Sequence, residues 1–235
     1  MSQQAFVLKL FEFAILVFAL SLHEAAHAWM ASRLGDPTAR MLGRLTLNPI
    51  KHIDPFGTIL IPLAMLFLPF FGNFLIGWAK PTPVTTRNFK NLRRDDILTT
   101  LAGPASNVLA AVAATIALIV LARLNAAGAE MVRELAGGIA GPGLSAPSPA
   151  VPIAVILYFA VWLNLILAVF NMVPLPPLDG SHILRHFLPY KALRVYDSMG
   201  MISLIVFLFL GARLLGMFVD PMLGFVNAVL LNFAV

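Results

Sequence analysis

The sequence predicts an all-α polytopic membrane protein built on a core of three transmembrane helices. Hydrophobic residues make up 60% of the chain and charged residues only 11%, whereas soluble domains carry about 25% charged residues. The apolar residues lie in long runs separated by basic or proline-rich stretches. We expect a re-entrant or β-hairpin segment after the first span and one or two extra C-terminal helices. Residues 1–235 are predicted to form a single integral-membrane domain.

The first predicted span covers residues 5–32, and Gly35-Asp36-Pro37 ends it. No basic region or small-residue cleavage site accompanies this run, so we expect a retained helix. Residues 38–47 show no helical period, and they are predicted to form a β-hairpin or a loop.

Residues 56–76 are apolar but interrupted by several prolines and glycines. These breaks favour a re-entrant hairpin that protein covers, with an ordinary short span as the alternative. The stretch from Trp78 to Val84 comes next. Pro81 and Pro83 exclude a helix there and favour an extended segment.

The remainder of the chain contains two clean predicted spans, over 97–122 and 151–173, and a further one over 199–217. Residues 181–198 are amphipathic and basic. Residues 220–235 are apolar but short, so they form either a final thin span or an interfacial helix.

Basic residues are concentrated in three stretches, which predicts the topology. They hold 12 of the 16 Lys and Arg residues, whereas Arg133 alone lies between Arg123 and Pro152. The positive-inside rule therefore places all three stretches in the cytoplasm, in a cytoplasmic (inner) membrane. These basic residues are Arg33, Arg40, Arg44, Lys51, Lys80, Arg87, Lys90, Arg93, Arg94, Arg185, Lys191 and Arg194.

A metal-binding pattern, H-E-x-x-H, ends the first apolar run at His23, Glu24 and His27. A helix advances about 100° per residue, so both imidazoles lie on one face and can bind one zinc ion. Glu24 stands beside them and can take a proton from a zinc-bound water. About 0.002 such patterns are expected by chance in this composition. The alternative is a pair of buried, hydrogen-bonded histidines.

The best candidate for a third zinc ligand is Asp179. The chain has no cysteine, so only His, Asp, Glu or water can complete the site. Asp179 follows a proline-rich break at the predicted inner end of a span, although an Asp there can equally cap the helix that follows. His182 and His186 form a rival pair, which we interpret as one face of a helix at the membrane surface.

Asn107 and Asn171 are polar residues at the ends of apolar spans. Either side chain can donate a hydrogen bond to an oxyanion that develops during a reaction. Either can equally bond one helix to another, which is the commoner use of Asn in membranes. We favour the functional interpretation for Asn171, because it lies close to Asp179, and the packing interpretation for Asn107.

Four motifs together resemble the site-2 protease family of intramembrane zinc metalloproteases. They are H-E-A-A-H, G-W-A-K-P-T-P-V, A-G-P-A-S-N and N-M-V-P-L-P-P-L-D-G, and they cover residues 10–195. The resemblance implies His23, His27 and Asp179 as ligands of one Zn²⁺ per chain and Glu24 as the catalytic base. It is closest to the compact branch, since PDZ and CBS domains are absent between and after these motifs.

The resemblance implies hydrolysis of peptide bonds in membrane-spanning protein substrates, in contact with the lipid bilayer. Two rival functions are a zinc transporter and a non-catalytic zinc-binding scaffold. A transporter commonly has internal repeats, and we find none in this sequence. Basic residues flank apolar spans, so nothing indicates nucleic-acid binding. The sequence predicts neither the substrate nor the oligomeric state.

Overall fold

The computed structural model describes residues 3–67, 77–138, 148–210 and 212–233. No strand forms among these residues. Its α-helices are α1 (Gln3–Arg33), α2 (Thr38–Met41), α3 (Ile61–Phe67), α4 (Leu92–Leu124), α5 (Ala126–Gly137), α6 (Ala150–Asn171), α7 (Asp179–Arg185), α8 (Tyr190–Leu210) and α9 (Ala212–Phe233). Three short helical segments are η1 (Pro49–Lys51), η2 (Pro55–Leu60) and η4 (Thr86–Asn88).

Within the described chain, four helices are long and apolar enough to cross a membrane: Phe6–Arg33, Leu92–Leu124, Ala150–Asn171 and Leu215–Phe233. Large apolar side chains on their outer faces are exposed, such as Leu109, Ile116 and Phe225. Water would not tolerate so many of them, whereas lipid would. The fold is therefore the predicted all-α polytopic membrane protein.

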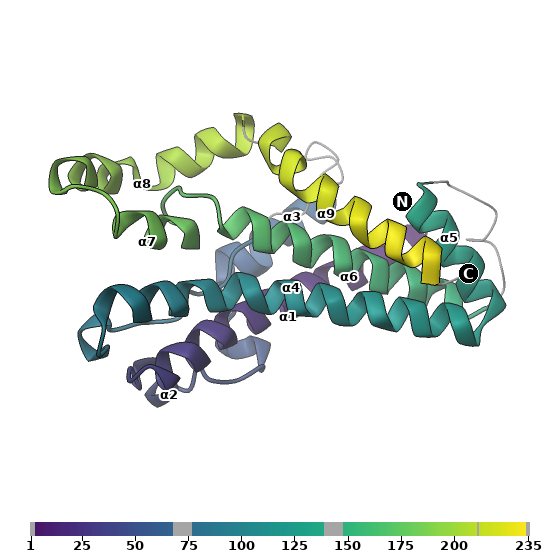
Figure 1. The fold of residues 1–235 in the computed structure, drawn as a ribbon. Coiled ribbons are helices and arrows are strands. Elements are labelled where there is room, and N and C mark those ends of the chain that lie inside the picture. Colours follow the sequence, from purple (N-terminus) through teal and green to yellow (C-terminus); the bar gives the residue numbers. More distant parts are fainter. Residues whose placement is uncertain (1–2, 68–76, 139–147, 211, 234–235) are drawn as a thin grey trace.

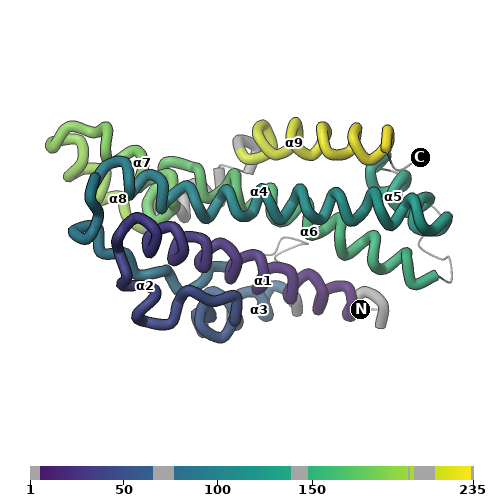
Figure 2. The backbone as a smooth tube through the Cα atoms, turned by 60° about the horizontal axis from the view of Figure 1, so that its bottom comes forward, coloured from purple at the N-terminus to yellow at the C-terminus, as the bar shows by residue number. Residues whose placement is uncertain are grey.

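Helix α4 is the centre of the bundle and packs against both α1 and α6 (Figures 1 and 2). Small residues are buried on these helices, such as Ala28 and Ala31 on α1 and Ala111 on α4. Small side chains let helix backbones approach closely, which membrane helices need because lipid provides no hydrophobic drive between them. Helices α7 and α8 lie at one end of the bundle, and α5 lies at the other (Figure 1).

Two predicted elements differ from the structure. Residues 38–47 form α2 and turns, so the loop alternative holds and the β-hairpin does not. The predicted span over 199–217 is divided between α8 and α9. Gly200 breaks α8 with a φ of +45°, a backbone conformation that glycine adopts without steric cost. Residues 220–233 belong to the longer helix α9, which begins at Ala212.

The two ends of the predicted re-entrant segment meet. The Trp78 backbone N–H donates to the Gly57 carbonyl oxygen over 3.1 Å, and the Thr58 hydroxyl donates to the Trp78 carbonyl oxygen over 2.7 Å. A Cβ on Gly57 would lie 2.3 Å from the Trp78 ring, so only glycine permits this contact. Gly57 and Trp78 therefore lie side by side, and the re-entrant path of the residues between them stays a prediction. Residues 68–76 lie outside the described residues.

Asp36, just after α1, anchors the segment that follows this hairpin. Its buried carboxylate accepts hydrogen bonds from the Thr85 backbone N–H (2.7 Å), the Asn88 side chain (2.7 Å) and both donors of Thr38. Burial alone would raise the pKa of Asp36, but these hydrogen bonds outweigh it and lower the pKa below its usual value. The charged carboxylate thus fixes residues 78–88 against the end of α1.

Replacing Asp36 with Asn should lower the free energy of unfolding at neutral pH by about 2–3 kcal/mol, because several buried donors lose a charged acceptor. The folded-state pKa is depressed, so this stabilisation is complete above the unfolded pKa of about 4 and is lost as the pH falls through the folded value. Thermal unfolding of the detergent-solubilised protein between pH 7 and pH 3 measures the difference.

The matched control is Asp197→Asn. Asp197 pairs with Arg185 at the exposed surface, so its loss should change stability by less than about 1 kcal/mol. If the difference in the free energy of unfolding between wild type and Asp36→Asn stays constant down to pH 3, the anchoring role of Asp36 is contradicted.

Candidate metal centre

The two histidines of the H-E-x-x-H pattern lie one turn apart on α1, on a face that packs into the bundle. His23 and His27 are both buried, and their ring centroids are 4.7 Å apart. The preceding turns of α1 are apolar, and Leu16 and Ala19 are buried against α6. The helix therefore carries two imidazoles to the inside of the protein rather than to lipid.

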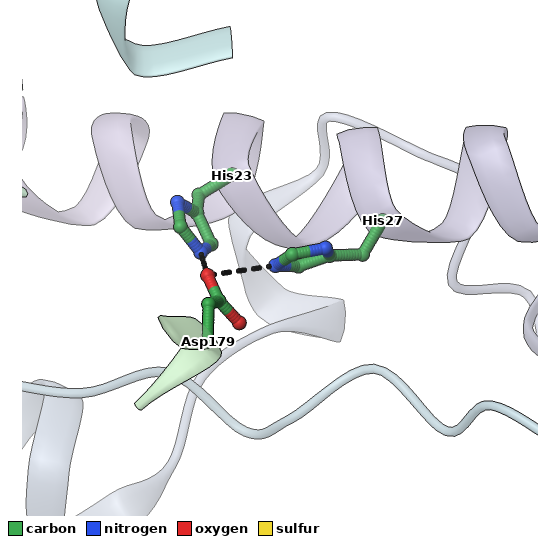
Figure 3. Close-up of side chains that lie close together, drawn as sticks. All are labelled: His23, His27 and Asp179. Atoms are coloured by element: carbon green, nitrogen blue, oxygen red, sulfur yellow. Dashed lines mark hydrogen bonds and ion pairs between the residues drawn. The ribbon is translucent and has the colours of Figure 1, made fainter. Parts of the chain in front are cut away.

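Asp179 comes from α7 and completes the cluster (Figure 3). Its Oδ2 atom lies 3.0 Å from His23 Nε2 and 3.4 Å from His27 Nε2. The N-cap residue of α7 is Leu178 and forms no side-chain cap bond, so the Asp179 carboxylate points to the histidines rather than capping. A Cβ on Gly180 would lie 2.3 Å from the Met172 carbonyl oxygen, so glycine is needed for the chain to fold back here.

Helix α8 holds the proline-rich loop that delivers Asp179. The Tyr196 hydroxyl donates to the Pro174 carbonyl oxygen over 2.9 Å, and the Ser203 hydroxyl donates to the Pro176 carbonyl oxygen over 3.0 Å. These carbonyls belong to a stretch of bends and turns, so they need hydrogen-bond partners other than a helical N–H. The two hydroxyls meet that need and fix the loop.

A chain of side-chain amides orients His23. The Ala160 carbonyl oxygen can only accept, so the Asn164 amide nitrogen donates to it over 2.9 Å, which leaves Asn164 Oδ1 to accept from Asn107 Nδ2 over 2.8 Å. Asn107 Oδ1 therefore accepts from His23 Nδ1 over 2.6 Å. The hydrogen of His23 is thus on Nδ1, and the lone pair of Nε2 faces Asp179.

His27 is oriented in the same way by a backbone carbonyl. Its Nδ1 lies 2.7 Å from the Thr99 carbonyl oxygen of α4, which accepts its hydrogen. Pro104 lies inside α4 and lacks an N–H, so the carbonyl four residues before it, next to Thr99, loses its helical partner. The missing helical hydrogen bond therefore lies one residue from the carbonyl that receives the imidazole.

Two imidazole lone pairs and a carboxylate therefore converge on one point, where only a cation can satisfy all three. One ligand atom from each of these residues lies within 4.8 Å of the other two, and no other group of this kind was found in the described part of the chain. Two histidines and a carboxylate are a donor set that zinc accepts, with Nδ1–H bonds that fix the ligands. A Cβ on Gly103 would lie 2.4 Å from His27 Nε2 and 2.6 Å from His23 Nε2, so glycine keeps this space open. These residues fit a zinc ion.

Glu24 lies next to the cluster and contacts the extended segment. Its Oε2 accepts from the Thr82 backbone N–H over 2.6 Å, and its backbone carbonyl accepts from the Thr82 hydroxyl over 2.9 Å. Thr82 stands between Pro81 and Pro83, so its N–H is the one donor that this part of the backbone offers. That donor is directed to Glu24.

The other predicted residues lie elsewhere. The Asn171 amide nitrogen donates to the Leu167 carbonyl oxygen of its own helix over 2.9 Å. His186 Nε2 lies 2.7 Å from Asp96 Oδ2 at the start of α4, and His182 is exposed. Neither histidine of this pair joins the cluster.

Four residues that contact or shape the cluster of His23, Glu24, His27 and Asp179 were not predicted from the sequence. They are Asn164, Thr99, Thr82 and Gly103. Asn164 carried a signal, since it is a polar residue in the middle of an apolar helix. Gly103 lies within one of the recognised motifs. Thr99 acts through its backbone carbonyl, which every residue has, so its residue type gives no signal.

Comparison with known proteins identifies the family of this chain. Residues 11–212 match the model of Peptidase family M50. YwhC of Bacillus subtilis, named as a candidate zinc metalloprotease, is 39% identical over 89% of this chain and 84% of its own. Rip2 of Mycobacterium tuberculosis H37Rv, with the same description, is 31% identical over 85% of this chain and 66% of its own. No solved structure matches the chain. The protein is a multi-pass membrane protein that belongs to Peptidase family M50, the site-2 proteases.

Proposed function

We propose that this chain is an intramembrane zinc metalloprotease that hydrolyses peptide bonds in or near transmembrane segments of membrane-protein substrates. His23, His27 and Asp179 would hold one zinc ion, and Glu24 would be the catalytic base. The observation that carries the proposal is the convergence of the three ligand atoms beside Glu24, within a bundle of membrane-spanning helices. The domain would comprise all of residues 1–235.

A zinc ion bound there would polarise the scissile carbonyl and lower the pKa of a water molecule towards about 7. Glu24 would accept the proton of the attacking water and pass it to the leaving amine. The Thr82 N–H holds one carboxylate oxygen of Glu24, which fixes the side chain in place for this transfer. The water attack breaks the C–N bond and gives a new carboxylate and a new amine.

Asn107 has a positioning role in this proposal. It is completely buried, and its amide donor is bonded to Asn164, so it orients His23 rather than meeting an oxyanion. Asn171 lies at the end of α6, just before the loop to Asp179, and we propose that it contacts the substrate when its bond to Leu167 opens.

The rival functions agree less well with these contacts. A transport site needs ligands that release the ion, whereas each imidazole here is held by a fixed acceptor. A structural zinc site is closed by four protein ligands, and the described residues provide three. Neither rival gives Glu24 a task.

Glu24→Gln keeps the shape of the side chain but cannot accept a proton. Purified Glu24→Gln should therefore retain zinc at the wild-type stoichiometry and lose cleavage of a membrane-embedded reporter substrate by at least about a hundredfold. Metal analysis of the purified protein, together with a gel-based cleavage assay, measures both quantities. The matched variant His23→Ala should lose zinc as well as cleavage.

Equal loss of zinc in Glu24→Gln and His23→Ala would remove the distinction between base and ligand. Cleavage at the wild-type rate by Glu24→Gln would reject the proposed protease mechanism at this site.

We further propose that the protein lies in the cytoplasmic membrane with the metal centre towards the cytoplasm. The chain has no cysteine, so single cysteines can be introduced without interference. Cysteines at the exposed positions Arg40, Arg87 and Arg194 should react with a membrane-impermeant maleimide only after permeabilisation, and one at Glu130 should react in intact cells. Opposite behaviour of Arg40→Cys and Arg87→Cys would reject the re-entrant arrangement, and labelling of both in intact cells would reverse the orientation.

A further inference from the structure

A second site lies on the other side of the extended segment from Glu24. A cavity of about 550 Å³ opens there, and Pro81 and Pro83 line it. Thr82 lies between them and contacts Glu24 instead. Successive residues of an extended chain point to opposite sides, so Thr82 faces away from the cavity. The cavity is therefore separate from the metal centre but shares a wall with it.

The lining of this cavity is amphipathic. Three of its residues are basic (Arg44, Lys51 and Lys80), five are apolar, and none is acidic. A volume of this size is typical of small-molecule sites. The composition fits a ligand that has an anionic group and an apolar part.

Arg44 is the strongest indication of an anionic ligand. Its side chain belongs to a residue only 8% exposed, and its guanidinium donates to the Lys51 carbonyl oxygen. Among the described residues, which include every Asp and Glu of the sequence, Arg44 forms no ion pair. A buried cation without a counter-charge is costly, and an anion in the cavity would remove that cost.

The surroundings place the cavity at the depth of lipid headgroups. Trp78, two residues before the lining residue Lys80, is 43% exposed. Half-exposed tryptophans are typical of the membrane–water interface. Two apolar residues of the lining, Leu42 and Ile50, are 61% and 75% exposed, which suits contact with acyl chains.

We propose that this cavity binds the headgroup of an anionic phospholipid, with its phosphate against Arg44, Lys51 and Lys80 and its glycerol and acyl chains against Leu42 and Ile50. An acidic segment of a protein would use the same cations but not the exposed apolar rim. The bound lipid would hold the extended segment from the side opposite Glu24.

Native mass spectrometry of the delipidated, detergent-solubilised protein tests the proposal, with phosphatidylglycerol and phosphatidylcholine as probes. The wild type should bind phosphatidylglycerol more tightly than phosphatidylcholine. Lys51→Gln/Lys80→Gln should weaken this binding about 25-fold, since each lysine near a membrane surface contributes a factor of about five. Both lysines are exposed, so the variant should keep its fold, and its zinc content verifies this.

The matched control is Arg87→Gln/Lys90→Gln, which removes two exposed basic residues that do not line the cavity and should leave lipid binding within twofold. Equal binding of the two lipids, or equal loss in both double variants, would overturn the proposal. If equimolar glycerol phosphate displaces the lipid, the cavity recognises the phosphate group alone and the acyl chains add nothing to binding. Binding of an acidic peptide without phosphatidylglycerol would assign it to a protein partner.

Discussion

The structure depends on placing three converging electron-pair donors inside a bundle of apolar helices. Two imidazole nitrogens and a carboxylate oxygen point at one another, and lipid offers no water to separate them. Such an arrangement is stable only if a cation occupies its centre and if the Nδ1 atom of each imidazole has a hydrogen-bond partner. The fold meets the second condition through Asn107, Asn164 and the Thr99 carbonyl, all in the interior.

The architecture of the bundle follows from this constraint. Helix α1 supplies the histidines, α4 supplies their acceptors and the space at Gly103, and α6 supplies Asn164. Small residues on these helices allow the close approach that side-chain bonds between helices require. Helix α8 then braces the proline-rich loop that brings in Asp179, and Asp36 braces the segment that contacts Glu24. Residues outside the His23, His27 and Asp179 cluster thus determine its geometry.

The sequence predicted the elements that carry strong local signals. The H-E-x-x-H spacing and the apolar runs depend on helical periodicity, and Asp179 was identified because few carboxylates lie at membrane depth. The hydrogen bonds between helices could not be predicted from such local patterns. Asn164 meets Asn107 across 57 residues, and Thr99 contributes only its backbone. The predicted span over 199–217 is divided between α8, which ends at Leu210, and α9, which begins at Ala212, and hydropathy alone joins these two helices.

The central claim is that Asp179 completes a zinc site with the two histidines of α1. Zinc content of purified Asp179→Ala, compared with His182→Ala and His186→Ala, tests it most directly. Loss of one of three ligands should cost several kcal/mol of a total of about 10–16, so Asp179→Ala should lose most of its zinc and all of its cleavage. His182→Ala and His186→Ala should keep both. Full zinc occupancy in Asp179→Ala, with loss in either histidine variant, would contradict the account.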